Sequence, residues 1–149
     1  MRHHDQATTA TALQDQAEAA ARQASQALRD AALADPHITY SSGRAPLWVA
    51  AQLANVYTAV RAGTATYCPH IDAHHPRIVH AAVWAPGLIT CTDCVPELLM
   101  PDPIEDDICD RCHQLSDRLH PGAIAGGPLL LTYGLCPPCD AIVNQLPAA

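Results

Sequence analysis

Alanine and leucine recur along the N-terminal stretch 5–34 at the spacing of an amphipathic α-helix. The intervals alternate between three and four residues, which is the a/d pattern of a helix that packs closely against another helix. Thr8 or Thr9 can cap the start of this helix, and Asp35-Pro36 ends it, because the residue before a proline avoids helical geometry. The positions in the series are Ala10, Leu13, Ala17, Ala20, Ala24, Ala27, Ala31 and Ala34.

This pattern predicts a helical arm over residues 1–36 that pairs with a second copy of the chain or with the next helix. Each alanine buries little surface, so the stabilisation from each contact is small. Because alanine is so frequent in this stretch, the same series also fits a solvated arm that has no partner.

A second helical pattern follows a linker over residues 37–44. Pro46 suits the first turn of a helix, and Gly63 suits the position after its last turn. We interpret residues 45–63 as a core helix packed on the C-terminal part of the chain; the alternative is that its apolar face binds a partner. That face carries Val49, Leu53, Val56 and Val60.

Beyond residue 63 the hydrophobic pattern changes to that of short β-strands. Residues 64–67 form a first expected strand, and residues 77–84 alternate with a period of two. Pro86-Gly87 has the chemistry of a type II turn, after which residues 88–90 return as the second strand of a hairpin. On the strand 77–84, one side carries Ile78, His80, Ala82 and Trp84, and the other carries Val79, Ala81 and Val83.

The C-terminal part repeats this plan in outline, which indicates an internal duplication. The expected elements are a short helical or looped spacer over 96–103, a short helix over 114–119, a glycine-rich loop over 121–128, a strand over 129–133 and at most two helical turns from Asp140. We therefore predict an α+β fold in which two N-terminal helices precede two small β-hairpin modules, over residues 64–100 and 104–149.

All seven cysteines of the chain lie between residues 68 and 139, and six of them form three Cys-x-x-Cys pairs. The seventh, Cys68, stands two residues before His70. A Cys-x-x-Cys turn places two sulfurs beside free backbone N–H groups, and two such turns complete a tetrahedral zinc site. The sequence therefore predicts two closed Zn²⁺ sites. The three pairs are Cys91/Cys94, Cys109/Cys112 and Cys136/Cys139.

The spacing of the ligands favours pairing in sequence order. Between the two halves of the expected sites lie 20 residues in the first case and 23 in the second. His74 and His75 compete with His70 for the first site, and a cross-brace that joins the first pair to the third is the alternative arrangement. The preferred sites are Cys68, His70, Cys91 and Cys94, and then Cys109, Cys112, Cys136 and Cys139.

The donor set favours a structural role for the metal. A catalytic zinc keeps an open coordination position beside an acid/base group, whereas seven of these eight ligands are thiolates that offset the metal charge. We expect no catalytic residues and no cofactor besides two Zn²⁺ ions. Residues 109–113 also match the Cys-x-x-Cys-His motif of c-type haem, but we expect no export signal and interpret His113 as a surface residue or as a residue that supports the metal ligands without binding the ion.

These modules resemble tandem zinc ribbons and treble-clef zinc modules, a resemblance carried by the eight Cys and His ligands. It implies a scaffold for protein–protein or protein–nucleic-acid contact. Residues 109–140 also look like the zinc-bracketed frame of HNH-type nucleases. That family needs an adjacent Asp-His pair, whereas Asp117 and His120 are separated here, so this likeness implies at most a degenerate relative without nuclease activity.

Charge and composition narrow the expected function. The formal net charge is −7 and lysine is absent, whereas nucleic-acid-binding proteins usually carry a basic excess. We expect a non-enzymatic adaptor that binds a protein partner or self-associates through its N-terminal helix. The alternative is a nucleic-acid-binding regulator that uses Arg77, Arg111 and Arg118.

The remaining expectations concern origin and location. Abundant Ala, Pro and Arg without Lys or Phe indicates a GC-rich bacterial genome. We expect neither a secretory signal nor a membrane-spanning segment, and therefore a cytoplasmic protein that has no membrane partner and keeps its thiols reduced.

Overall fold

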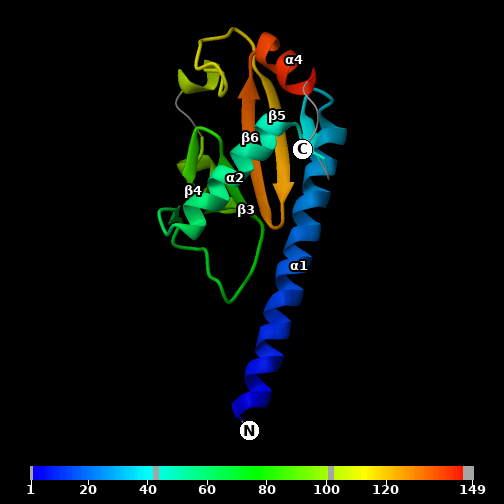
Figure 1. Cartoon of the computed structure of the whole chain (residues 1–149), viewed down its shortest axis with the longest axis vertical. Helices are drawn as coiled ribbons and strands as arrows, with labels where there is room; N and C mark the ends of the chain where they lie inside the picture. The colour runs from blue at the N-terminus through cyan, green and yellow to red at the C-terminus, as the bar shows by residue number, and fades with distance from the viewer. Residues whose placement is uncertain (1, 42–43, 101–102, 146–149) are drawn as a thin grey trace.

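The computed structural model describes residues 2–41, 44–100 and 103–145. In this part of the chain, four helices and a mixed sheet of six strands form an α+β fold, as predicted (Figure 1). The helices are α1 (Arg2–Ala34), α2 (Leu47–Arg61), α3 (Val95–Leu98) and α4 (Pro137–Gln145), with 3₁₀ turns η1 (Thr92–Cys94) and η2 (Glu105–Asp107). The strands are β1 (Thr39–Ser41), β2 (Thr66–Tyr67), β3 (Val79–Ala82), β4 (Ala85–Cys91), β5 (His120–Gly126) and β6 (Leu129–Leu135).

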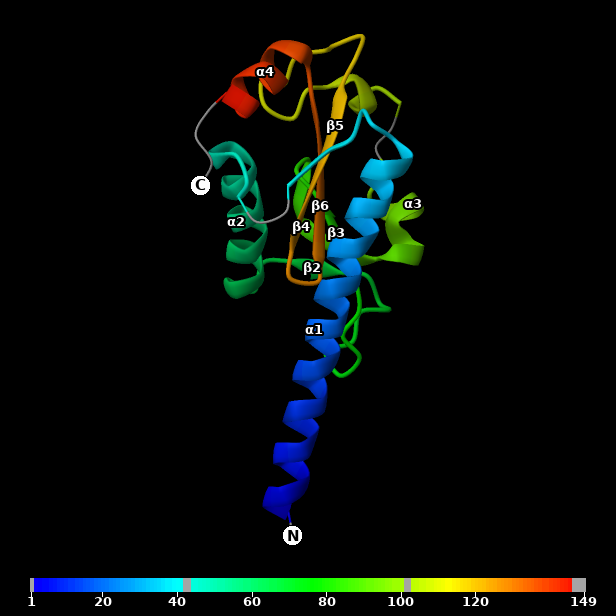
Figure 2. The ribbon, with the colours of Figure 1, turned by 90° about the vertical axis from the view of Figure 1, so that its right-hand side faces the viewer.

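Two antiparallel hairpins, β3–β4 and β5–β6, form the centre of the sheet. Strand β3 also pairs in parallel with β6, with Val79 opposite Leu129, so the two expected hairpin modules share one sheet. Strands β1 and β2 extend it in parallel beside β5 and β4, giving the order β1-β5-β6-β3-β4-β2. Helices cover both faces of the central strands (Figure 2). The strands therefore carry apolar residues on both faces of the sheet.

Helix α1 packs on one face of this sheet, against β1, β5 and β6. Ala24 and Leu28 are buried there against Ala123 and Leu130. The expected pairing of α1 with the second helix is wrong, because α2 lies on the opposite face of the sheet (Figure 2). Of the alanines in the predicted seam, Ala20 and Ala24 are buried, so the helix lies close to the sheet at this level, whereas Ala27, Ala31 and Ala34 are exposed.

The start of α1 also differs from the prediction. The helix begins at Arg2, so Thr8 and Thr9 lie within it instead of capping it. Its N-terminal half extends away from the sheet (Figures 1 and 2). No helix in the described part of the chain is long and apolar enough to cross a membrane.

Helix α2 covers the other face and confirms the predicted core helix. Val49 and Val56 are fully buried in the main core, and the Trp48 ring meets the Tyr133 ring edge-on at a centroid distance of 5.6 Å. Gly63, with φ of 71°, follows the helix and donates its N–H to the Val60 carbonyl at 3.1 Å, as expected for its C-terminal cap.

The predicted alternation along β3 is also seen. Val79, Ala81 and Val83 contribute to the core beneath α2, whereas Ile78 packs with the α1 cluster. The turn of this hairpin is not at Pro86-Gly87, which lies within β4. Ala82 pairs with Ala85 in the observed register, so the turn consists of the two residues between them.

Three further expectations in the C-terminal part and the linker are wrong. Residues 121–126 belong to strand β5 and not to a loop, residues 114–119 contain no helix, and the linker over 37–44 contains strand β1. Helix α4 begins at Pro137, before the expected Asp140. Residues 101 and 102 of the expected spacer and 146–149 of the expected tail lie outside the described residues.

The glycines of β5 explain why a glycine-rich segment forms a strand here. A Cβ atom at Gly122 would lie 2.2 Å from the ring of Tyr133, and one at Gly126 would lie 2.7 Å from the side chain of Leu53. Tyr57 of α2 donates its hydroxyl hydrogen to the Gly126 carbonyl. Neighbouring side chains therefore fill the space that a larger residue would need, and the two glycines are packing positions.

Candidate metal centres

The parallel pair β2–β4 assembles the first candidate centre. Cys68 directly follows β2 and donates its N–H to the Ile89 carbonyl of β4 at 3.1 Å. Cys91 is the last residue of β4, and Cys94 ends the η1 turn that follows it. With His70 from the loop after β2, these residues form a first group whose four ligand atoms lie within 4.8 Å of one another.

The distances in the first group suit a single tetrahedral ion. His70 Nδ1 lies 3.1 Å from Cys94 Sγ and 3.9 Å from Cys91 Sγ. Metal–ligand bonds of about 2.0 to 2.3 Å, as for zinc, place the ligand atoms of a tetrahedron roughly 3.3 to 3.8 Å apart. The two observed distances lie just below and just above this range, so the imidazole faces the thiols through Nδ1 at a separation that one shared ion can bridge.

The other histidines of this region have different partners. His75 Nδ1 lies 2.8 Å from the Asp72 carboxylate, and the His75 side chain is 72% exposed. The backbone N–H of His74 donates to the same carboxylate at 2.8 Å. His80 Nε2 lies 3.0 Å from Thr92 Oγ1. Of the candidates weighed from the sequence, His70 is the one that the structure brings to the thiols.

The second group forms between a tight turn and the end of the β5–β6 hairpin. Cys109 and Cys112 lie on a turn in which the Cys109 N–H donates to the Gln114 carbonyl at 3.0 Å. His113, with φ of 58°, turns the backbone back, in a left-handed conformation that side chains seldom adopt. Cys136 follows β6, and Cys139 lies in the first turn of α4.

The four sulfurs of the second group also lie within 4.8 Å of one another. Cys112 Sγ and Cys136 Sγ are 3.8 Å apart, close to the edge of a zinc–thiolate tetrahedron and far from the roughly 2 Å of a disulfide. All seven cysteines are free thiols. The structure therefore groups the ligands in sequence order, and not as a cross-brace.

Hydrogen bonds and burial act in opposite directions on the thiols of the first group. Burial raises the pKa of Cys68, but the backbone N–H groups of Cys91 and His70 outweigh it and lower this pKa to about 7. The Cys91 N–H donates to Cys68 Sγ at 3.2 Å. Burial and the neighbouring thiols of Cys91 and Cys68 raise the pKa of Cys94 to about 12.

The second group has the same contrast. Burial raises the pKa of Cys109, yet the backbone N–H groups of Cys112 and Cys136 lower it to about 7. The N–H of Cys139 acts to lower the pKa of Cys136, but burial and the neighbouring thiols prevail and raise it to about 12. Thiolates packed this closely repel one another unless a cation lies between them. Each group of four ligands could therefore hold one metal ion, an arrangement that suits structural metal binding.

Two arrangements beside the second group had no clear signal in the sequence. Asp110, inside the third ligand pair, accepts the Gly134 N–H at 2.7 Å, a contact that joins residues far apart in the chain. His120 Nδ1 lies 2.9 Å from Asp140 Oδ2, and Asn144 donates to Asp140 Oδ1 at 2.9 Å. The spacing of Asp140 and Asn144 by four residues fits one helix face, but nothing in the sequence indicated their contact with β5.

No protein-family model matches this chain, and no curated protein or solved structure matches it significantly. The interpretation of the two groups therefore rests on their own geometry and donor atoms.

Proposed function

We propose that this protein is a non-enzymatic adaptor whose fold is held by two structural Zn²⁺ ions. The observation that carries this proposal is the assembly of eight Cys and His ligands into two compact groups of four. Zinc has no geometric preference of its own and takes tetrahedral sets of thiolate and imidazole ligands. Seven of the eight donors are sulfur, which favours zinc over the harder ions magnesium and calcium.

The local anatomy of both groups supports zinc modules of the treble-clef type. Each group combines a turn that carries two ligands, an antiparallel hairpin, and a short helical segment whose start carries the other two. In the second group these parts are the turn 109–112, the hairpin β5–β6 and the helix α4. The first group has β3–β4 followed by η1 and α3.

The placement of the two groups supports a structural role for both ions. Cys91 pairs with Val79, which pairs in turn with Leu129 at the start of β6. Cys136 follows the far end of β6. The two groups therefore lie at opposite ends of the sheet, and each ion would hold one hairpin to its own turn.

A structural site has no coordination position left for a substrate, and this distinction can be measured. Replacing zinc by Co²⁺ should give absorption spectra of two tetrahedral sites. One site would have three thiolate ligands and one imidazole, and the other would have four thiolates. Adding azide or excess imidazole should leave both spectra unchanged. A spectrum that changes with azide would indicate an open site and would contradict the non-enzymatic proposal.

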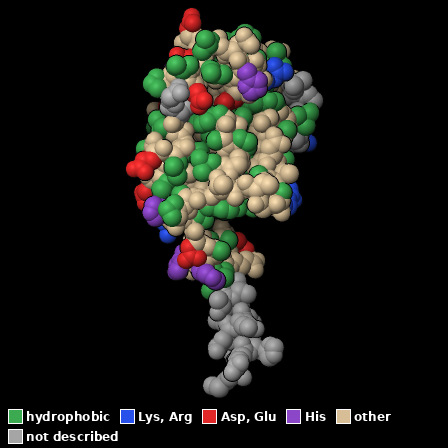
Figure 3. Space-filling model, turned by 90° about the vertical axis from the view of Figure 1, so that its left-hand side faces the viewer, with side chains coloured by type: hydrophobic (Ala, Val, Ile, Leu, Met, Phe, Trp, Pro, Cys, Tyr) green, Lys and Arg blue, Asp and Glu red, His purple; other side chains and the backbone are tan. Residues whose placement is uncertain are grey.

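Surface charge supports a protein partner over nucleic acid. On the face in Figure 3, acidic side chains stand among apolar ones, and the arginines lie near its edges. Arg111, a candidate nucleic-acid contact, points Nη1 toward Cys139 Sγ at 3.6 Å. A salt titration of DNA and RNA binding tests the alternative: salt-sensitive binding at low ionic strength would favour the regulator over the adaptor.

The N-terminal half of α1 offers one surface for such a partner. It extends past the sheet (Figure 1). Leu13 and Ala17, which belong to the predicted seam, are half-buried. Light scattering on the full chain and on a chain that starts at Gln16 would test self-association. We expect the full chain to have a mass above that of a single chain, and the shortened chain to have the mass of a monomer.

A further inference from the structure

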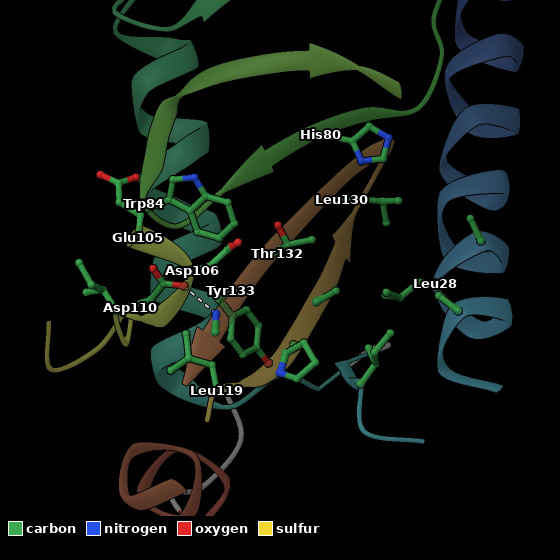
Figure 4. Close-up of a pocket in the computed structure, with 18 residues that line it drawn as sticks. Leu28, His80, Trp84, Glu105, Asp106, Asp110, Leu119, Leu130, Thr132 and Tyr133 are labelled. Atoms are coloured by element: carbon green, nitrogen blue, oxygen red, sulfur yellow. Dashed lines mark hydrogen bonds between the residues drawn. The ribbon is translucent and has the colours of Figure 1, made fainter. Parts of the chain in front are cut away.

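A cavity of about 490 Å³ lies between helix α1, the sheet and the η2 turn. None of the eight candidate metal ligands lines it, although it reaches the turn that carries Cys109 and Cys112. Figure 4 shows it between the strands and the helix. Its volume falls within the range of roughly 300 to 1,000 Å³ that is usual for small-molecule sites.

The walls of the cavity are mostly apolar. Leu28 of α1 and Leu130 of β6 form one side, and Trp84, Ile108 and Leu119 contribute to the rest. Helix α1 adds Ala27 and Ala31, whose small side chains leave the space beside the sheet open. An apolar ligand body would therefore replace water along most of this surface.

Three of the side chains that line the cavity are carboxylates, and these gather on one side, whereas His80, Thr132 and Tyr133 supply its other polar side chains. Glu105 and Asp106 of η2 and Asp110 from the metal-binding turn line it, and its lining contains no arginine. Figure 4 places these three residues beside Trp84, with His80 and Leu28 across the cavity. The Gly134 N–H, 2.7 Å from Asp110 Oδ2, holds that carboxyl group in place.

We propose that this cavity binds a small molecule with an apolar body and one protonated amine. Carboxylates beside low-dielectric walls concentrate a negative potential, which attracts a cation and repels an anion. The ammonium group would lie near Asp106 and Asp110, where the Trp84 ring can add a cation–π contact. The apolar body would extend toward Leu28 and Leu130.

Three probes of similar size and different charge test this proposal on the zinc-loaded full chain. They are 2-phenylethylamine, which is protonated at neutral pH, 2-phenylethanol and 3-phenylpropanoate. Calorimetry and tryptophan fluorescence should give saturable binding of the amine with a dissociation constant below about 1 mM. The neutral alcohol should bind at least about tenfold more weakly, and the carboxylate should not bind.

Matched variants locate the binding site. Asp106→Asn should weaken amine binding about fivefold, and Asp110→Asn, which keeps an acceptor for the Gly134 N–H, about tenfold. Asp107→Asn is the control, because Asp107 lies on the same exposed turn but outside the cavity lining. Ala31→Phe should abolish binding by filling the cavity, whereas Ala34→Phe, on the same helix and outside the lining, should not.

The proposal would be overturned by any of three results. The first is no saturable binding of the amine. The second is equal binding of all three probes, which would assign the cavity to an apolar protein segment instead. The third is an equal effect of the substitutions at Asp106 and Asp107.

Discussion

Asp110 and Gly134 are joined by two hydrogen bonds that fix the metal-binding turn to strand β6. The Asp110 N–H donates to the Gly134 carbonyl at 2.9 Å, and the Asp110 carboxylate accepts the Gly134 N–H at 2.7 Å. Asp110 itself lies between the candidate zinc ligands Cys109 and Cys112. Its side chain therefore adds a second hydrogen bond between the metal-binding turn and strand β6. This contact determines how Cys109 and Cys112 approach Cys136.

Replacing Asp110 by alanine should therefore destabilise the zinc-loaded protein by about 1 to 3 kcal/mol, because the Gly134 N–H loses its acceptor. Asp110→Asn should cost less than about 1 kcal/mol, since an amide oxygen can accept the same bond. Burial raises the pKa of Asp110, so removing its charge carries little penalty. Urea unfolding at fixed zinc measures both values. An equal loss for both variants would contradict the hydrogen-bond account.

Gly122→Ala should destabilise the fold by about 1 to 3 kcal/mol, because the new methyl group overlaps the Tyr133 ring. Gly87→Ala is the matched control, since nothing lies within 4 Å of its added Cβ. That substitution should be neutral or stabilise the protein by up to about 1 kcal/mol. Thermal unfolding of the two variants, side by side, decides whether the β5 glycine is a packing position.

Leu28 and Leu33 provide a comparison within helix α1. Leu28 is 5% exposed against the sheet, whereas Leu33 is 85% exposed. Leu28→Ala should cost about 2 to 5 kcal/mol of unfolding free energy, and Leu33→Ala less than about 0.5 kcal/mol. Equal effects in denaturant unfolding would show that α1 does not pack on the sheet through this face.

His70→Ala removes one of the four candidate ligands and should weaken zinc binding at the first group by about a hundredfold or more. Loss of a hydrogen bond to a metal ligand costs roughly 10- to 100-fold in affinity, and loss of a ligand should cost more. His74→Ala should leave the affinity unchanged, because His74 does not belong to the first group of ligands and contacts Asp72 through its backbone N–H, which the substitution keeps. Competition with a chromophoric chelator measures the affinity of each variant. A loss on changing His74 alone would mean that the first group has a different fourth ligand.

The candidate ligands were predictable because their signal is local. The spacing of Cys109 and Cys112 already places two sulfurs on one turn, and the equivalent spacing of Cys136 and Cys139 completes the set. The two long helices, α1 and α2, were predictable for a similar reason: the period of apolar residues and the glycine after α2 depend on neighbouring positions. The same holds for the α+β class of the fold.

The rest depends on contacts between distant residues. Strand β5 was expected to be a loop because glycine disfavours strands, but its glycines make room for Tyr133 and Leu53. Strand β1 exists through its pairing with β5, with Thr39 opposite Gly122. Neither the strand partner of a residue nor the face on which α1 packs can be read from hydrophobic period alone.

The most direct test of two structural zinc ions is native mass spectrometry of the reduced protein, together with metal analysis. We expect two Zn²⁺ per chain, released with loss of tertiary structure when a strong chelator is added, because binding and folding are coupled. A protein that carries no stoichiometric zinc and keeps its tertiary structure after chelation would contradict this account.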